Sequence, residues 1–445
     1  MNKPENGSVP TQNGVRMWVL LALLVLSAVM ATIDRQVMAL VVEPLKKDFG
    51  LSDFELGLVQ GLSFGLFYCV AGIPLGRLID KYNRVRILFL GILSWSIMTM
   101  LCGFSSTILQ FFFFRVGAAV GEAVLHPAAY SLIADTFPPK RMVRAVMIFL
   151  TSVLFANGLA FIAGGAVVKA ITSLPELPFG LRPWQATFFL VGAPGLVLAA
   201  FFLMVREPDR LSGDREGLAT FGDSIRYIWG RRRDYGPLYG CSLLLAVPTM
   251  TTYLWMPTHF IRTYGLDAST SGYYIGVIYL VLPALGGFAG SVITEKWQNA
   301  GRHDASMRIV LLCALIGTVG GLAGIMSRLE HTLVLMLPLA LIPVAYYANI
   351  VALLQLLTPS RMRGVNSALL LLATNLGAAA LASPLVGAMS DTLFAGKPWG
   401  LGAGVALVNV SCGMLAAAIA VSSLERFGRV MRDSVERPSG PSHVL

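Results

Sequence analysis

Long runs of hydrophobic residues, separated by short polar segments, follow one another along almost the whole chain. A transmembrane α-helix needs about 20 consecutive apolar residues, and twelve of the runs reach that length. They lie near residues 17–42, 54–79, 85–104, 107–135, 141–171, 185–205, 237–261, 270–293, 308–327, 332–357, 362–390 and 399–424. The pattern predicts an all-α membrane protein with twelve transmembrane helices.

One polar connection is longer than the others and divides the runs into two groups of six. It covers residues 206–236, and its part Phe221–Arg233 has the pattern of an amphipathic helix on the membrane face or of a solvated linker helix. We therefore expect five parts. They are a cytoplasmic N-tail at 1–16, a six-helix bundle at 17–205, a cytoplasmic middle loop at 206–236, a second six-helix bundle at 237–424 and a cytoplasmic C-tail at 425–445.

Short segments of the first group recur in the second. Pro139–Met142 (PKRM) resembles Pro359–Met362 (PSRM), and Asp80–Tyr82 (DKY) resembles Glu295–Trp297 (EKW). Related halves predict two pseudo-symmetric six-helix bundles, the arrangement in which transporters bind substrate between repeats near the membrane midplane. A channel formed by one bundle would not need this duplication.

Composition supports membrane insertion, and the charges set the orientation. Only 13% of the residues are charged, against about a quarter in soluble proteins. With the N-terminus in the cytoplasm, 25 of the 34 Lys and Arg residues lie in cytoplasmic segments and 7 in outer loops. This bias predicts that both termini are cytoplasmic. Together with the short outer loops, it favours a multi-pass protein of the cell inner (plasma) membrane.

The sequence gives no sign of enzyme chemistry. All five cysteines lie in apolar runs without CxxC spacing, which favours packing roles over a metal site or disulfides. HExxH, GxxxxGK[ST] and GxSxG motifs are absent from the sequence. A membrane acyltransferase would need a His/Asp pair near an interface, and His126 with Asp135 is a poor candidate. We expect no enzyme activity, no cofactor, no metal and no nucleic-acid partner.

Four charged residues interrupt the apolar runs. Asp34 and Arg35 lie in the first run, and Arg115 and Glu122 lie in the fourth. A charge at the bilayer centre costs about 2.5–3.5 kcal/mol even on insertion scales. Arg115 and Glu122 are seven residues apart, so they lie on one side of a helix. That side is expected to face a watered, protein-lined cavity.

The depth of each charge predicts which residues pair. Asp34 and Arg115 both lie roughly 12 Å from the outer ends of their antiparallel spans, at 1.5 Å per residue. They are therefore level and should pair. Glu122 lies about 10 Å deeper and has no level cation unless Arg35 reaches down to it. The formal charges of the four residues sum to zero.

Glu122, with Asp34, is the predicted proton-coupling group. Burial favours the neutral carboxyl and an approaching arginine favours the carboxylate, so a rearrangement could exchange a proton for substrate. Arg35, Arg115 and His126 are the predicted substrate contacts of this half. The alternatives are a structural clamp for the ion pairs and a helix-kink role for His126, which precedes Pro127.

The second group of spans contains only neutral polar residues in its interior. Its predicted substrate contacts are Tyr253, Tyr347, Asn349 and Asn375. The alternative for each of them is packing between helices. Charge in one half and none in the other suits an amphiphile, with a charged headgroup on Arg35 and Arg115 and an acyl chain along the second half.

The segment Gly76–Arg86 (GRLIDKYNRVR) resembles the loop signature of the major facilitator superfamily between its second and third spans. We interpret Gly76, Asp80, Arg84 and Arg141 as a latch of the outward-open state. Gly72 and Gly76 are expected to let helices approach closely.

Within that superfamily, three stretches resemble the spinster branch. They are Asp34-Arg35, Asp80–Arg84 (DKYNR), and Arg115–Ala123 (RVGAAVGEA) followed by LIADTFPPKR. The resemblance implies a lipid transporter for lysophospholipid or sphingoid phosphate, with membrane-embedded acids at Asp34 and Glu122. Ala160–Gly165 (AFIAGG) lacks the proline of the GPxxGG pattern in drug–proton antiporters.

Together these observations predict a monomeric secondary transporter. Its expected partners are a lipid-like small-molecule substrate, protons and membrane lipids. The alternatives within the same superfamily are a proton-coupled symporter for small organic anions and a drug exporter.

Overall fold

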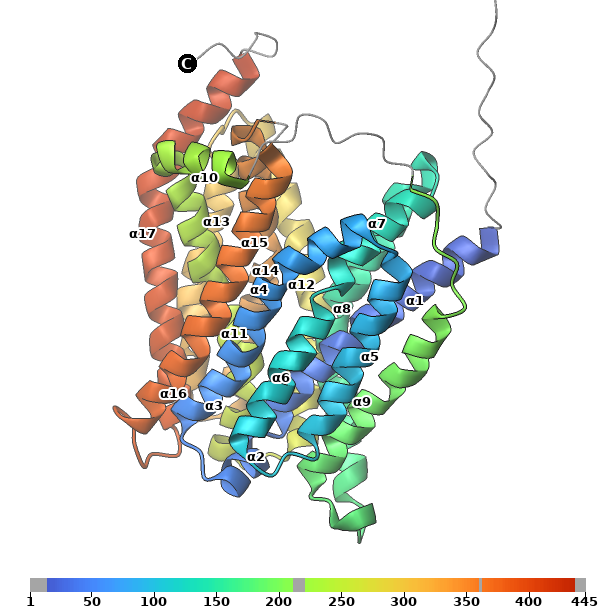
Figure 1. Cartoon of the computed structure of the whole chain (residues 1–445). Helices are drawn as coiled ribbons and strands as arrows, with labels where there is room; N and C mark the ends of the chain where they lie inside the picture. The colour runs from blue at the N-terminus through green and yellow to red at the C-terminus, as the bar shows by residue number, and fades with distance from the viewer. Residues whose placement is uncertain (1–13, 211–220, 360–361, 437–445) are drawn as a thin grey trace, which may run out of the picture.

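A computed structural model describes residues 14–210, 221–359 and 362–436. The described chain is a bundle of long helices, and its two ends lie on the same side of the bundle (Figure 1). We call this side the terminal side, residues 14–210 the first half and residues 221–436 the second half.

The elements of the first half are α1 (Gly14–Leu40), α2 (Val42–Phe49), α3 (Asp53–Gly57), η1 (Leu58–Leu62), α4 (Ser63–Lys81), α5 (Arg84–Cys102), α6 (Ile108–Glu122), α7 (Leu125–Thr136), α8 (Pro139–Thr172), η2 (Pro178–Gly180) and α9 (Pro183–Phe202). Those of the second half are α10 (Phe221–Gly230), α11 (Arg232–Tyr264), α12 (Ala268–Asn299), α13 (Ala305–Gly321), η3 (Leu322–Ile325), α14 (Leu329–Leu357), α15 (Arg363–Gly377), η5 (Ala378–Ala382), α16 (Ser383–Asp391) and α17 (Gly400–Glu436).

Ten helical runs of the described residues are long and apolar enough to cross a membrane. Two further runs have the length but a less continuous apolar pattern. They are α11, which contains three prolines, and the series α15–η5–α16, in which a π-helix interrupts the α-helix. Both extend along the bundle beside the other long helices (Figure 1). The described chain therefore has the predicted all-α fold with twelve crossings.

The buried apolar residues form three clusters that follow the two halves. One cluster is drawn from the first half alone and extends from Met17 to Phe202. Another, from Tyr235 to Phe427, belongs to the second half alone. The third combines residues of both halves. Each half thus has its own core and shares a further one with its partner, while the exact domain boundaries stay a prediction. The N-tail up to residue 13, loop residues 211–220, Arg361 and residues 437–445 lie outside the described chain.

The halves touch most closely along glycines on the side opposite the termini. A Cβ at Gly57 would lie 2.6 Å from the carbonyl oxygen of Ser383, and a Cβ at Gly61 would overlap the carbonyl oxygen of Ala379. Between α8 and α12, a Cβ at Gly276 would lie 2.7 Å from the carbonyl oxygen of Gly158. Real Cβ atoms do not approach other atoms this closely, so these backbones can meet only because the residues are glycine.

Toward the terminal side the contact between the halves ends. A Cβ at Gly72 or Gly76, both in α4, would meet nothing within 4 Å. The close helix approach that we expected at these two glycines is therefore absent in this conformation. We infer that the halves part at this depth, since α4 and α15 diverge toward the terminal side (Figure 1). The structure is closed on the side opposite the termini and parted on the terminal side.

Candidate functional site

Two crossed ion pairs join α1 to α6 inside the first half. The Arg115 Nη1 atom lies 3.2 Å from Asp34 Oδ1, and the Arg35 Nη2 atom lies 2.7 Å from Glu122 Oε2. The Thr99 hydroxyl of α5 donates a 2.6 Å hydrogen bond to Asp34 Oδ2. The predicted pairing of Asp34 with Arg115 is confirmed, and Arg35 does reach the deeper Glu122.

The four charges differ in their access to solvent. Asp34, Arg115 and Glu122 are at most 3% exposed, whereas the Arg35 side chain is 37% exposed. Arg115 is thus buried and bound to Asp34 in this conformation, where it cannot contact a substrate. This geometry favours the clamp interpretation for the Asp34–Arg115 pair and leaves Arg35 as the one accessible charge of the cluster.

The cluster also contains unsatisfied polar atoms. Among the described residues, Glu122 Oε1, Arg35 Nε and Arg115 Nε are buried without a hydrogen-bond partner. Buried polar atoms are nearly always paired in folded proteins. The second oxygen of Glu122 is therefore an unused acceptor, which could take a proton or a hydrogen bond.

Aromatic residues of α4 hold the exposed arginine. The Arg35 guanidinium carbon lies 4.8 Å from the centre of the Phe64 ring and 5.3 Å from the centre of the Tyr68 ring. The Arg115 guanidinium carbon lies 5.3 Å from the centre of the same Phe64 ring. Cation–π contacts of this kind stabilise a partly desolvated guanidinium. Sequence reasoning missed Phe64 and Tyr68, because aromatic residues four apart in an apolar run are ordinary core residues.

His126 is connected to this aromatic pair. Its Nδ1 atom lies 3.1 Å from the Tyr68 hydroxyl, and its ring packs edge-on against Phe149. Span four is interrupted just before it, since α6 ends at Glu122 and α7 begins at Leu125. Pro127 explains the interruption, because it has no N–H to donate to the carbonyl of Ala123. His126 therefore adjoins the site and also lies at the predicted kink.

The cluster lies at the depth where the two halves part. Gly65 of α4 is still in contact, since its Cβ would lie 2.6 Å from that of Ala379, whereas Gly72 is free. Arg35 packs on Phe64, directly beside Gly65. Because α1 contacts α11 and α4 contacts α15, the helix that carries Arg35 and the helix that carries its aromatic neighbours both border the second half. We infer that the exposed part of Arg35 is reached from the terminal side.

The predicted contacts of the second half are placed differently. Tyr253 is 7% exposed and packs between Phe161 of the first half and Tyr279. The Asn349 side chain accepts a 2.9 Å bond from Thr294 and donates one to the Ala345 carbonyl, so both of its polar ends are already used. Asn349 thus fits the packing alternative. Tyr347 and Asn375 are half-buried on α14 and α15.

Of the four predicted latch residues, Arg84 lies in an ionic network within the first half. Arg84 is 1% exposed and binds Glu207 at 2.7 Å, Asp135, and the carbonyl of Pro208 at 2.9 Å. Arg210 donates to the backbone carbonyl of Asp80 and to two neighbouring carbonyls. Gly76 meets no neighbour and the Arg141 side chain is exposed. The latch itself stays a prediction about another conformation.

A second ionic network joins the halves on the side opposite the termini. Asp53, at the start of α3, receives two hydrogen bonds of 2.7 and 2.8 Å from Arg262 of α11, one of 2.5 Å from Lys46 and one of 2.7 Å from Ser390. Arg262 also binds Glu43 at 2.6 Å. Asp391 accepts bonds from the first backbone N–H groups of α3. Sequence reasoning missed this network, in which hydrogen-bonded residues lie up to 338 positions apart in the chain.

Comparison with known proteins gives the following matches. The family model described as Major Facilitator Superfamily matches residues 24–382. A protein named MFS-type efflux pump from Mycolicibacterium smegmatis is 26% identical over 387 residues, 85% of either chain. A probable L-galactonate transporter from Escherichia coli is 25% identical over 328 residues, 70% of this chain and 69% of its own. Protein spinster homolog 1 from Xenopus tropicalis is 27% identical over 303 residues, 66% of this chain and 50% of its own.

One solved structure with a similar fold is described as a bacterial homolog to the human lysosomal transporter Spinster in an inward-facing and unoccupied conformation. It is 24% identical, covers 97% of this chain and 100% of its own, and has a TM-score of 0.77. The predicted resemblance to spinster proteins is thus confirmed in both sequence and fold.

We predict that Asp53→Asn opens the contact between the halves. The exchange leaves Arg262 with a weaker partner in a buried setting, and breaking a buried ion pair costs about 3–5 kcal/mol. The measurement is the melting temperature of the purified protein in detergent, together with labelling of a cysteine placed at Val386, a buried residue of the core that the halves share. Asp53→Asn should lower the melting temperature and raise the rate of cysteine labelling.

The matched control is Asp304→Asn, which breaks the Asp304–Arg308 pair, a half-exposed contact of 2.8 Å within one helix end. Such pairs contribute less than about 1 kcal/mol, so this variant should behave like the parent protein. Equal effects of both variants would contradict a role of Asp53 in closing the halves.

Proposed function

Since the chain belongs to the Major Facilitator Superfamily and is a multi-pass membrane transporter, we propose that it moves an anionic amphiphile across the membrane by rocker-switch alternating access. The substrate class is a lysophospholipid or a sphingoid phosphate. The terminal side is the cytoplasmic side of the inner (plasma) membrane, as the Lys and Arg bias favours, and the working unit is a monomer.

The observation that supports this proposal most directly is the setting of Arg35. Its guanidinium is the accessible charge of the cluster, lies between α1 and α4 at the depth where the halves part, and stacks on Phe64 and Tyr68. An arginine fork binds phosphate through two parallel hydrogen bonds.

The second half favours an apolar substrate body. The interiors of its spans contain no Asp, Glu, Lys or Arg, and its polar Asn349 is engaged in bonds between helices. A small, fully polar substrate would need hydrogen bonds from both halves, whereas an acyl chain needs only an apolar wall. We propose that Tyr347 and Asn375 line that wall on the side of α14 and α15.

Proton linkage follows from competition for Arg35. Glu122 and an anionic headgroup both need the Arg35 guanidinium. When the headgroup takes Arg35, Glu122 loses its ion-pair partner, and a buried carboxylate without a partner binds a proton instead. Substrate and proton would then bind together. Asp34 was expected to share the proton-coupling role. Because Arg115 and Thr99 occupy both its oxygens in this conformation, we propose that Glu122 carries the proton and that Asp34 holds Arg115.

Alternating access would use the contacts between the halves. The glycine contacts and the Asp53–Arg262 network close the side opposite the termini in this conformation. Opening that side must break the network, and closing the terminal side would bring Gly72 and Gly76 against the second half. The predicted latch at Asp80, Arg84 and Arg141 would act in that second state.

A second candidate is a proton-coupled symporter for a small organic anion. The similarity to the probable L-galactonate transporter favours it, because Arg35 could bind a carboxylate as readily as a phosphate. The similarity to a protein named as an efflux pump is consistent with transport out of the cell. The uncharged second half argues against a sugar acid as substrate, because many of its hydroxyl groups would find no hydrogen-bond partner there.

Transport assays in proteoliposomes separate the two candidates. We predict that the protein moves a lysophospholipid or sphingoid phosphate, that galactonate neither competes nor is transported, and that Arg35→Gln reduces the transport rate at least tenfold. Arg308→Gln, which removes an equal charge from an exposed helix end, is the matched control and should leave the rate unchanged. Transport of galactonate with no lipid transport would overturn the lipid assignment.

The proton linkage predicts a specific pH response. In the parent protein, substrate affinity should rise as pH falls, because protonation of Glu122 releases Arg35 for the headgroup. Glu122→Gln releases Arg35 permanently, so this variant should bind substrate tightly and show no pH dependence. Asp34→Asn is the comparison and should keep the pH response. The linkage is wrong if Glu122→Gln retains the full pH response in a binding titration.

A further inference from the structure

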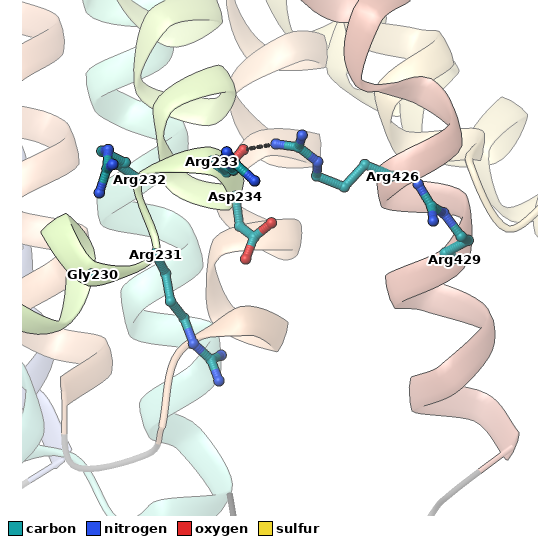
Figure 2. A pocket seen from close by; sticks show the side chains of 7 residues that line it. All are labelled: Gly230, Arg231, Arg232, Arg233, Asp234, Arg426 and Arg429. Carbon is teal, nitrogen blue, oxygen red and sulfur yellow. Dashed lines mark hydrogen bonds between the residues drawn. The ribbon is translucent and has the colours of Figure 1, made fainter. Parts of the chain in front are cut away.

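A basic cavity lies at the terminal end of the second half, separate from the ion cluster of the first half. Its volume is about 660 Å³. It lies between the start of α11 and the terminal part of α17 (Figure 2). Its lining consists of Gly230, Arg231, Arg232, Arg233, Asp234, Arg426 and Arg429. Five arginines and one aspartate give this lining a formal charge of +4.

Contacts between the two helices give the cavity a defined shape. The Arg426 guanidinium of α17 donates a hydrogen bond to the backbone carbonyl of Arg233 at the start of α11 (Figure 2). Arg429 follows three residues later, so it lies on the same face of α17. Arg231 is held on the other wall by the Tyr227 ring, 5.1 Å from its guanidinium carbon. Cations therefore border the cavity on both helices.

The surrounding residues place the cavity at the level of lipid headgroups. On α10, the adjacent amphipathic helix, Trp229 is 70% and Ile225 is 45% exposed, and exposed tryptophans are typical of the membrane–water interface. On α17, the exposed apolar residues Met414, Leu415 and Val421 precede Arg426. Val421 and Arg426 are about 7.5 Å apart along the helix, roughly the step from acyl chain to phosphate.

We propose that this cavity binds the headgroup of an anionic phospholipid from the leaflet on the terminal side, with the acyl chains along the apolar face of α17. Arginine pairs with phosphate through charge-assisted hydrogen bonds, and basic pockets between transmembrane helices are a known form of headgroup site. A charge of +4 exceeds what one phosphate neutralises, so a lipid with two phosphates, such as cardiolipin, fits better than one with a single phosphate.

A lipid bound in this cavity would stabilise the second half without contacting the transported substrate. The headgroup would bridge α11 and α17 and bind the amphipathic α10 to the same surface. α11 also contributes Arg262 to the network that closes the opposite side. A lipid that holds α11 in place would thus stabilise the second half as a unit, whatever substrate the central site takes.

Native mass spectrometry of the purified full-length protein tests the proposal. The probes are cardiolipin, phosphatidylglycerol and phosphatidylcholine, added to the protein in detergent. We expect bound cardiolipin in preference to phosphatidylcholine. The triple variant Arg231→Gln, Arg426→Gln and Arg429→Gln should lose about tenfold or more in cardiolipin affinity, since each arginine contributes separately to binding of anionic lipid.

The matched control removes three exposed cations from the terminal end of the first half, by Arg77→Gln, Arg86→Gln and Lys140→Gln, and should keep the parent affinity. Equal losses in both triple variants, or no loss in the first, would overturn the proposal. Inorganic phosphate that displaces cardiolipin at equal concentration would also overturn it, by showing a site for a soluble anion. If the triple variant does not fold, Arg429→Gln alone should give a smaller loss in the same direction, and no loss there would count against the site.

Discussion

Ionised side chains in the membrane interior must be paired, and this constraint organises the first half. Four charges lie on α1 and α6, and their pairing requires these two helices to face each other in one register, within reach of the side chains. α5 is fixed to the same centre through Thr99, and α4 through the rings of Phe64 and Tyr68. Because one of the four, Arg35, remains partly exposed, the same centre that holds the helices together also offers a cation to a ligand.

The division between a holding pair and an exchangeable pair gives the cluster its chemistry. Asp34 and Arg115 are buried, and Thr99 occupies the second oxygen of Asp34. Glu122 depends on Arg35 for its charge balance and keeps one oxygen free. A ligand that competes for Arg35 therefore changes the state of Glu122 without disturbing Asp34. In the proposed cycle this change accompanies the movement of the halves, which contact each other on the side opposite the termini through glycines and through Asp53 and Arg262.

The sequence predicted those parts of the molecule that depend on local pattern. Apolar run lengths gave the crossings, and helix rise alone placed Asp34 level with Arg115 and Glu122 below them. Other parts depend on contacts that local pattern does not contain. Phe64 and Tyr68 look like any aromatic residues of an apolar span until Arg35 is seen against them. The Asp53 network joins residues of both halves that no spacing relates. Gly72 and Gly76 were expected in close contact, but whether they meet a neighbour depends on which side of the protein is open.

The central claim is that the substrate headgroup takes Arg35 from Glu122, and that Glu122 then binds a proton. Difference infrared spectroscopy of the protein in lipid, before and after addition of a sphingoid phosphate, which has no carbonyl group of its own, measures this directly. The account predicts that a protonated carboxyl C=O band appears on binding and is missing in Glu122→Gln. Saturable binding with no carboxyl change in the parent protein, or the same band in Glu122→Gln, would contradict it.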